Sequence, residues 1–173
     1  MTKTRPARRV SFLSIALTST ALAAPAPPSI FVVAPSGVPA AGPTFGCGDR
    51  LVEVALTTGS VTPMKTALTT LFTYRPRDPG LINPLRRGRL RVERITLDAR
   101  RRTAVVHLSG TLQLNGVCDA PRVTTQLNET ATQFPNVRQA CFFLNGAPLE
   151  RALDESGRTI PADVCTRTFT RRP

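Results

Sequence analysis

The chain has 173 residues, with 23 Lys or Arg against 11 Asp or Glu, which gives a formal net charge of +12. Its four cysteines lie 71, 23 and 24 positions apart and there is one histidine, so the close ligand pairs of a zinc site are missing and a structural metal is disfavoured. Beyond residue 23 no segment is long and apolar enough to span a bilayer, which argues against stable membrane insertion.

The first 23 residues are typical of a secretory signal peptide. Basic residues such as Lys3 and Arg5 precede an uncharged stretch at 10–22, which ends in the small-residue pattern Ala21-Leu22-Ala23. That stretch has 13 residues including five Ser or Thr, which is short for a membrane-spanning helix and disfavours an uncleaved anchor. We therefore expect a secreted or periplasmic protein of the cell envelope, whose even number of cysteines forms two disulfides.

Residues 24–46 contain six prolines and no charge, which predicts an extended linker. Within it, Ile30 to Val33 has the composition of a short strand. The composition changes after Gly46, so a single folded domain is predicted over 47–149, followed by a basic C-terminal tail over 150–173 that Cys165 ties back to the domain.

The first predicted strand is LVEVALT at 51–57, in which alternate apolar residues share a face. Thr62 followed by Pro63 is a favourable helix start. The helix predicted over 63–73 carries one apolar stripe, made of Met64, Ala67, Leu68, Leu71 and Phe72.

Residues 75–89 hold three prolines and two glycines and are predicted to be a loop. A hairpin follows, with arms at 90–98 and 103–110 joined by the basic turn ARRR. In the first arm Val92 and Ile95 are three positions apart, so they share a face only if a bulge lies near Glu93 or Arg94.

A second helix is predicted from Pro121 to Phe134, and Pro135 ends it. Its apolar stripe consists of Val123, Leu127, Ala131 and Phe134. The last strand, VRQACFFLNG, turns Ala140, Phe142 and Leu144 inward and ends at Asn145-Gly146. The order is β-α-β-β-α-β, so the expected fold class is α+β: one four-stranded antiparallel sheet of strand order 4-1-3-2, with two helices on one face.

The segment TQFPNVRQACFFLNGAPL and the hairpin arm V-x-L-S resemble the GerMN domain of spore-germination and sporulation proteins, over roughly residues 50–150. The chain departs from that pattern at 86-RRGR-89, at His107, and in its four cysteines. The resemblance implies action through protein contacts at the envelope, with an envelope protein or a second copy as partner. It implies no enzyme activity and no cofactor.

The candidate catalytic residues do not form a catalytic arrangement in the sequence. His107 and Ser109 lie two residues apart on one strand face, where side chains project in parallel, so they do not make a Ser-His-Asp arrangement. The acids Asp49, Glu53, Asp98 and Asp119 fall at strand ends or turns without a visible grouping, so a cell-wall hydrolase is only an alternative hypothesis.

The densest charge feature is a run of arginines around the hairpin. Guanidinium groups bind phosphate-bearing polymers or acidic partners, although a solvated loop is the simpler interpretation. Nucleic acid is disfavoured because the cluster lacks interleaved aromatic residues and the protein is expected to be exported. The cluster consists of Arg86, Arg87, Arg89, Arg91, Arg94, Arg100, Arg101 and Arg102.

Three disulfide pairings are open to four cysteines. In the expected sheet Cys47, before strand one, lies near Cys118, after strand three, which favours their pairing. Cys141 is expected to project from the sheet face without helices, where the tail would bring Cys165 to it. The favoured pairing is therefore Cys47 with Cys118 and Cys141 with Cys165.

Overall fold

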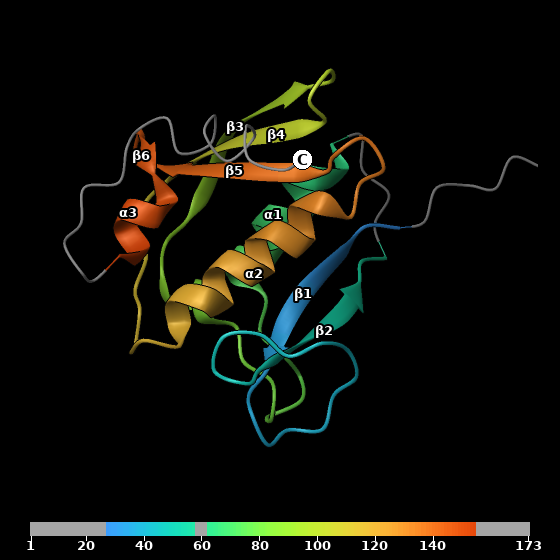
Figure 1. Ribbon diagram of the computed structural model, residues 1–173, viewed down its shortest axis with the longest axis vertical. Coiled ribbons are helices and arrows are strands. Elements are labelled where there is room, and N and C mark those ends of the chain that lie inside the picture. Colours follow the sequence, from blue (N-terminus) through green and yellow to red (C-terminus); the bar gives the residue numbers. More distant parts are fainter. Residues whose placement is uncertain (1–26, 58–61, 155–173) are drawn as a thin grey trace, which may run out of the picture.

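The computed structural model describes residues 27–57 and 62–154. The predicted signal peptide and nearly all of the predicted tail lie outside these residues. The fold is α+β, as predicted, with two sheets and three α-helices in the described part (Figure 1). The elements in order are β1 Ser29–Ala34, β2 Arg50–Ala55, α1 Pro63–Thr73, the 3-10 helix η1 Pro84–Arg87, β3 Arg91–Asp98, β4 Thr103–Ser109, α2 Asp119–Thr132, β5 Gln139–Leu144, β6 Ala147–Pro148 and α3 Leu149–Leu153.

The prediction of one antiparallel sheet in the order 4-1-3-2 is wrong. The main sheet has the order β3-β4-β5-β6, and β4 pairs directly with β5 in parallel, with Val106 opposite Phe142. The connection between these two strands contains α2, and such helical crossovers are how parallel neighbours are joined. The strand predicted first, now β2, lies outside this sheet.

β2 pairs with β1 in a separate two-stranded antiparallel sheet, with Val32 opposite Val52. β1 lies inside the segment that was expected to be an extended linker. Pro28 and Pro35 bracket it and leave six residues free of proline, enough for a short strand rich in β-branched residues. Ile30 to Val33, whose composition suggested a short strand, therefore lie in a strand. The linker prediction is wrong for residues 29–34.

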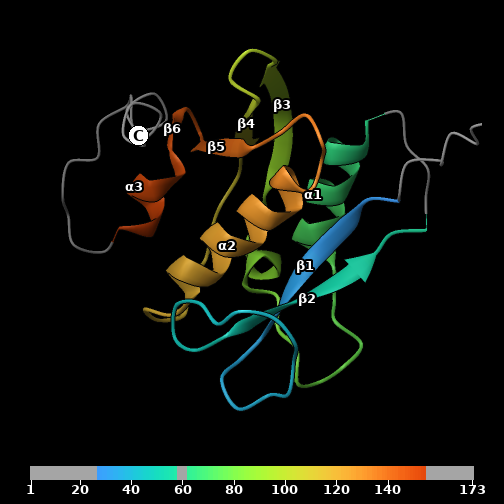
Figure 2. The same ribbon diagram turned by 45° about the vertical axis from the view of Figure 1, so that its right-hand side comes forward.

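The predicted helical stripes are buried in one core. Figures 1 and 2 show α1 and α2 between the main sheet and the β1–β2 sheet. The same core contains Ala104, Val106 and Leu108 from β4 and Phe142 and Leu144 from β5, so both helices pack on one face of the main sheet, as predicted. Ile30 of β1 closes this core from the opposite side.

Local irregularities also follow the sequence. The register of β3 against β4 shifts between Val92 and Arg94, which confirms the predicted bulge. Asn145 and Gly146 have positive φ angles of 49° and 82° in the turn between β5 and β6, as their residue types favour. α2 begins and ends two residues earlier than predicted, and the short α3, whose Leu149 and Leu153 pack on the core, extends beyond the predicted end of the domain.

Candidate functional site

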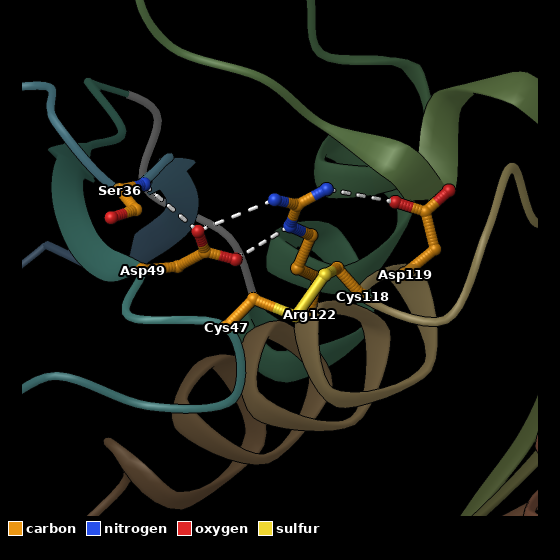
Figure 3. Close-up of a disulfide and its surroundings, with 6 residues drawn as sticks. All are labelled: Ser36, Cys47, Asp49, Cys118, Asp119 and Arg122. Carbon is orange, nitrogen blue, oxygen red and sulfur yellow. Dashed lines mark hydrogen bonds and ion pairs between the residues drawn. A yellow bond between two sulfur atoms is a disulfide. The ribbon is translucent and has the colours of Figure 1, made fainter.

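The buried acidic side chains of the described residues belong to an ion-pair network at the start of α2. Asp49, just before β2, and Asp119, the first residue of α2, are each about 1 % exposed. Arg122 lies between them (Figure 3): its Nε and Nη2 donate to Asp49 at 2.6 and 3.3 Å, and its Nη1 donates to Asp119 at 3.2 Å. One guanidinium therefore bridges two carboxylates that the sequence separates by 70 positions.

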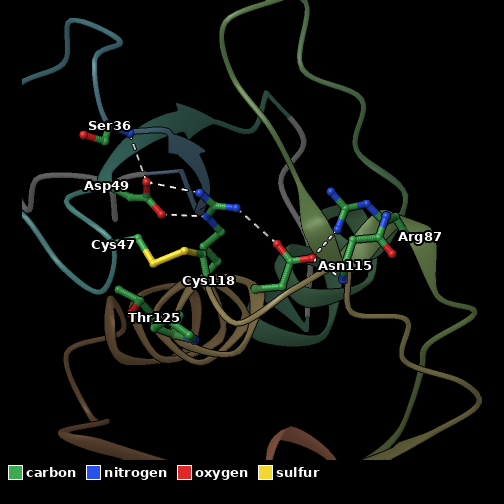
Figure 4. Close-up of polar contacts among 10 residues, drawn as sticks. Ser36, Cys47, Asp49, Arg87, Asn115, Cys118 and Thr125 are labelled. Atoms are coloured by element: carbon green, nitrogen blue, oxygen red, sulfur yellow. Dashed lines mark hydrogen bonds and ion pairs between the residues drawn. A yellow bond between two sulfur atoms is a disulfide. The ribbon is translucent and has the colours of Figure 1, made fainter. Parts of the chain in front are cut away.

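Further partners complete the network. Asp49 also accepts a hydrogen bond from the backbone N–H of Ser36 at 3.0 Å, and Asp119 accepts one from the backbone N–H of Asn115 at 2.8 Å. The guanidinium of Arg87, at the end of η1, pairs with the second oxygen of Asp119 (Figure 4). Two carboxylates thus face two guanidiniums, and the formal charge of the network is zero.

The network shifts the pKa of both members of its tightest pair. The hydrogen bond from Arg122 lowers the pKa of Asp49 below its ordinary value, and this effect outweighs burial, which acts in the opposite direction. The hydrogen bond to Asp49 raises the pKa of Arg122. Both groups are held in their charged forms, whereas a general acid would need a carboxyl whose pKa is raised toward neutrality.

A disulfide lies beside the network. Cys47 and Cys118 are bonded, with their Cα atoms 5.8 Å apart, which confirms the first predicted pair (Figure 3). It joins the turn before β2 to the residue before α2, next to Asp49 and Asp119 respectively. The ion pairs and the disulfide therefore fix the same two segments to each other.

The second predicted pair, Cys141 with Cys165, includes a residue outside the described part of the chain. Cys141 is 4 % exposed and is absent from the helix-covered core, in agreement with its predicted place on the opposite face of the sheet. It is not a free thiol.

The residues weighed as catalytic have other contacts. The ring of His107 stacks on Phe143 of β5, with centroids 5.2 Å apart, and its Nε2 lies 3.2 Å from the guanidinium of Arg94. The hydroxyl of Ser109 donates to Glu93 rather than to His107. Of the four acids without a visible grouping in the sequence, the structure brings Asp49 and Asp119 together around Arg122.

The predicted arginine cluster is divided by the fold. Arg86, Arg87 and Arg89 lie before β3 and Arg100, Arg101 and Arg102 lie after it, at opposite ends of an eight-residue strand that is about 26 Å long at 3.3 Å per residue. Four of the eight arginines have side-chain partners: Arg87 pairs with Asp119, Arg101 with Asp98, Arg102 with the carbonyl of Pro135, and Arg94 with His107. The others make no such bond with the described residues. They are Arg86, Arg89, Arg91 and Arg100.

A groove of about 440 Å³ lies between the start of α1 and β3. Met64, Ile95, Leu97 and Phe134 form its apolar lining, and Lys65 and Arg94 contribute positive charge. Leu97 is 48 % exposed, which makes it one of two large hydrophobic side chains exposed in the part of the chain that the structure describes. Sequence reasoning missed this groove because its walls come from three separate elements.

The comparisons define the family. The family model Germane, described as sporulation and spore germination, matches residues 34–150, more than half of the chain. The protein therefore belongs to the Germane family, in agreement with the resemblance to the GerMN domain. No match was found among curated proteins or among solved structures.

No group of three or more His, Cys, Asp or Glu side chains within 27–57 and 62–154 is arranged to hold a metal ion. None of the helices in these ranges has the length and apolar character needed to cross a membrane.

Proposed function

We propose that this protein is a non-enzymatic module of the cell envelope that acts through contacts with protein partners or by assembly with copies of itself. Membership of the Germane family supports a process related to sporulation or germination. One observation carries the proposal. Both buried carboxylates of the described residues are bound by Arg122, so they join segments of the fold to each other. The surface offers an apolar groove and a strand edge, which suit the binding of protein.

The disulfide supports the proposed location. Disulfides form and persist in oxidising compartments outside the cytoplasm. The bond between Cys47 and Cys118, together with the predicted signal peptide, supports a secreted or periplasmic protein.

In-cell crosslinking tests the proposal. Cells that produce the tagged protein are crosslinked, and the captured proteins are identified by mass spectrometry. We expect a reproducible set of envelope proteins, or crosslinked copies of the chain itself. The purified protein is incubated in parallel with peptidoglycan, and release of soluble fragments would overturn the proposal in favour of a cell-wall hydrolase.

A binder of anionic envelope polymer is the second candidate. It is favoured by Arg86, Arg89, Arg91 and Arg100, whose guanidiniums are without partners among the described residues. It predicts retention on a polyanion column that falls steeply with salt. Charge reversal at Arg86, Arg89, Arg91 and Arg100 should weaken that retention, and unchanged retention would remove this candidate.

A further inference from the structure

We propose that the free edge of β3 and the groove beside it bind an extended acidic segment of a protein partner, which adds to the main sheet as a strand. This inference rests on the proposed function, because it names the surface and the chemistry of the partner. Four observations carry it: an open strand edge, an apolar groove along that edge, positive charge around the groove, and the contrast with the closed edge of β1.

The open edge is the first observation. β3 is the outermost strand of the main sheet and pairs only with β4 among the described residues. Figure 2 shows it at the end of the sheet, beside α1. After the bulge at Glu93, the register of Arg94 to Asp98 against β4 is regular. Along this stretch alternate residues turn their backbone N–H and C=O groups away from β4, and a further strand can bond these groups, since main-chain pairing gives such added strands their affinity.

The groove supplies a place for an apolar side chain. Ile95 and Leu97 project from β3 toward it, Met64 closes it from α1, and Phe134 closes it from the segment that follows α2. Alternate residues of a strand point to the same side. A strand added along β3 would therefore place every second side chain over the groove, where exposed apolar surface such as that of Leu97 is covered.

Charge decides between an acidic partner and a second copy. Lys65 and Arg94 line the groove, and Arg91 and Arg100, which have no side-chain partner within 27–57 and 62–154, lie near the two ends of β3. The one acid in the lining, Glu93, accepts a hydrogen bond from the hydroxyl of Ser109. Asp98 of β3 already accepts hydrogen bonds from the backbone N–H groups of Arg100 and Arg101. Pairing two copies through β3 would bring together two edges that each carry more basic than acidic groups, whereas aspartate or glutamate on the added strand would face opposite charge.

The bulge and the charges have a simpler interpretation as protection against edge-to-edge aggregation. The edge of β1 shows how this chain closes an edge with its own groups. The amide of Gln133 bonds both the N–H and the C=O of Ser29, at 2.6 and 2.8 Å, and Gln126 donates to the carbonyl of Phe31. Val33 exchanges two backbone hydrogen bonds with Ile82. No comparable cover lies on β3 in the described part, so its charges permit an acidic strand while opposing self-pairing.

A peptide-binding experiment tests the inference. The probe is a fluorescently labelled seven-residue peptide that alternates valine with aspartate, and the control peptide has lysine in place of aspartate. Anisotropy titration of the purified, disulfide-bonded protein should give saturable binding for the acidic peptide only, weaker at high salt. Hydrogen exchange should slow at the amides of β3 when the peptide is bound. Absence of binding, or protection elsewhere in the chain, would overturn the inference.

Variants separate the groove from general charge attraction. Arg94→Glu and Leu97→Asp should each weaken binding at least tenfold, whereas the matched reversal Arg75→Glu, at another exposed arginine, should change it by less than twofold. Circular dichroism checks that each variant is folded. Equal weakening by Arg75→Glu would reduce the effect to net charge and refute the inference, as would a peptide-free dimer that Leu97→Asp dissociates. If peptide binding fails while crosslinking still captures partners in cells, only this inference is lost and the proposed function stands.

Discussion

Replacement of Arg122 by methionine is the most direct test of the ion-pair network. Arg122→Met keeps much of the side-chain stem but removes the only cation that contacts Asp49 among the described residues. Asp119 keeps Arg87 and the N–H of Asn115, while Asp49 keeps only the N–H of Ser36. Leaving one buried carboxylate without its partner costs about 3 kcal/mol. We expect a loss of that size in the free energy of unfolding at pH 7.

The loss should depend on pH with a defined sign. In the native protein the pKa of Asp49 is lowered from 3.8, so its ionised form adds stability above that value, and this stability is lost as the pH falls through the lowered pKa. In Arg122→Met, burial without a cation should raise the pKa of Asp49, so the variant loses stability as the pH rises from about 3.8 through the raised value. The difference between the two proteins should therefore be largest near neutral pH and shrink below pH 4.

Urea unfolding followed by far-UV circular dichroism measures this difference, because the chain has one tyrosine and no tryptophan. Arg75→Met, at an exposed arginine, is the matched control and should change stability by less than about 0.5 kcal/mol. The double variant Asp49→Asn, Arg122→Met should be more stable than Arg122→Met alone, because it removes the unpaired charge. A loss below about 1 kcal/mol for Arg122→Met, or additive losses in the double variant, would refute the reasoning.

Three further predictions concern other constraints on the fold. Replacing Cys47 and Cys118 together by serine opens a loop of 71 residues and should cost about 4 kcal/mol by urea unfolding; a loss under about 1 kcal/mol would contradict it. Gly110→Ala would place a Cβ 1.8 Å from the carbonyl oxygen of Arg89 and should cost at least about 3 kcal/mol, whereas Gly116→Ala, also at positive φ but in open space, should cost about 1–2 kcal/mol. Equal losses of stability in Gly110→Ala and Gly116→Ala would contradict this prediction, because the close contact with Arg89 would then add nothing to the backbone strain. Gln133→Leu leaves the N–H and C=O of Ser29 unpaired, which should lower the free energy of unfolding by about 2 kcal/mol and speed amide exchange at Ser29. Gln113→Leu, at an exposed glutamine, is the control, and unchanged exchange in Gln133→Leu would contradict the prediction.

Much of the fold is predictable because local patterns determine it. The stripe on α1, the bulge near Glu93 and the turn at Asn145-Gly146 each depend on a few neighbouring residues, and all were found. The pair Cys47–Cys118 was also predicted, although the sheet used to argue for it was wrong. Those two cysteines meet because α2 begins beside the turn before β2, not because they share a sheet edge.

The arrangement of strands could not be predicted in the same way. Which strands pair depends on contacts between distant segments, and the alternating pattern at 51–57 fits either sheet. The high proline count of residues 24–46 led to the prediction of a linker there and so hid β1. Proline restricts a strand only at its own position and at the residue before it, and residues 29–34 contain none. Because β1 pairs with β2, β2 takes no place in the main sheet, and β4 pairs directly with β5 instead.

A signal for the missing strand was nevertheless present on α2. Beside the apolar stripe runs a second, polar stripe at helical spacing, made of Asp119, Arg122, Gln126, Thr130 and Gln133. Gln126 and Thr130 are fully buried, and a buried amide needs a hydrogen-bonding partner. A strand edge offers such partners at regular intervals, and the two glutamines of this stripe bond to Phe31 and Ser29 of β1. Because solvent-facing helix positions are normally rich in charge, the uncharged polar residues Gln126, Thr130 and Gln133 next to an apolar stripe indicate that the helix packs against backbone on a second side. In this chain that stripe predicts a further strand more directly than the residues of the strand itself.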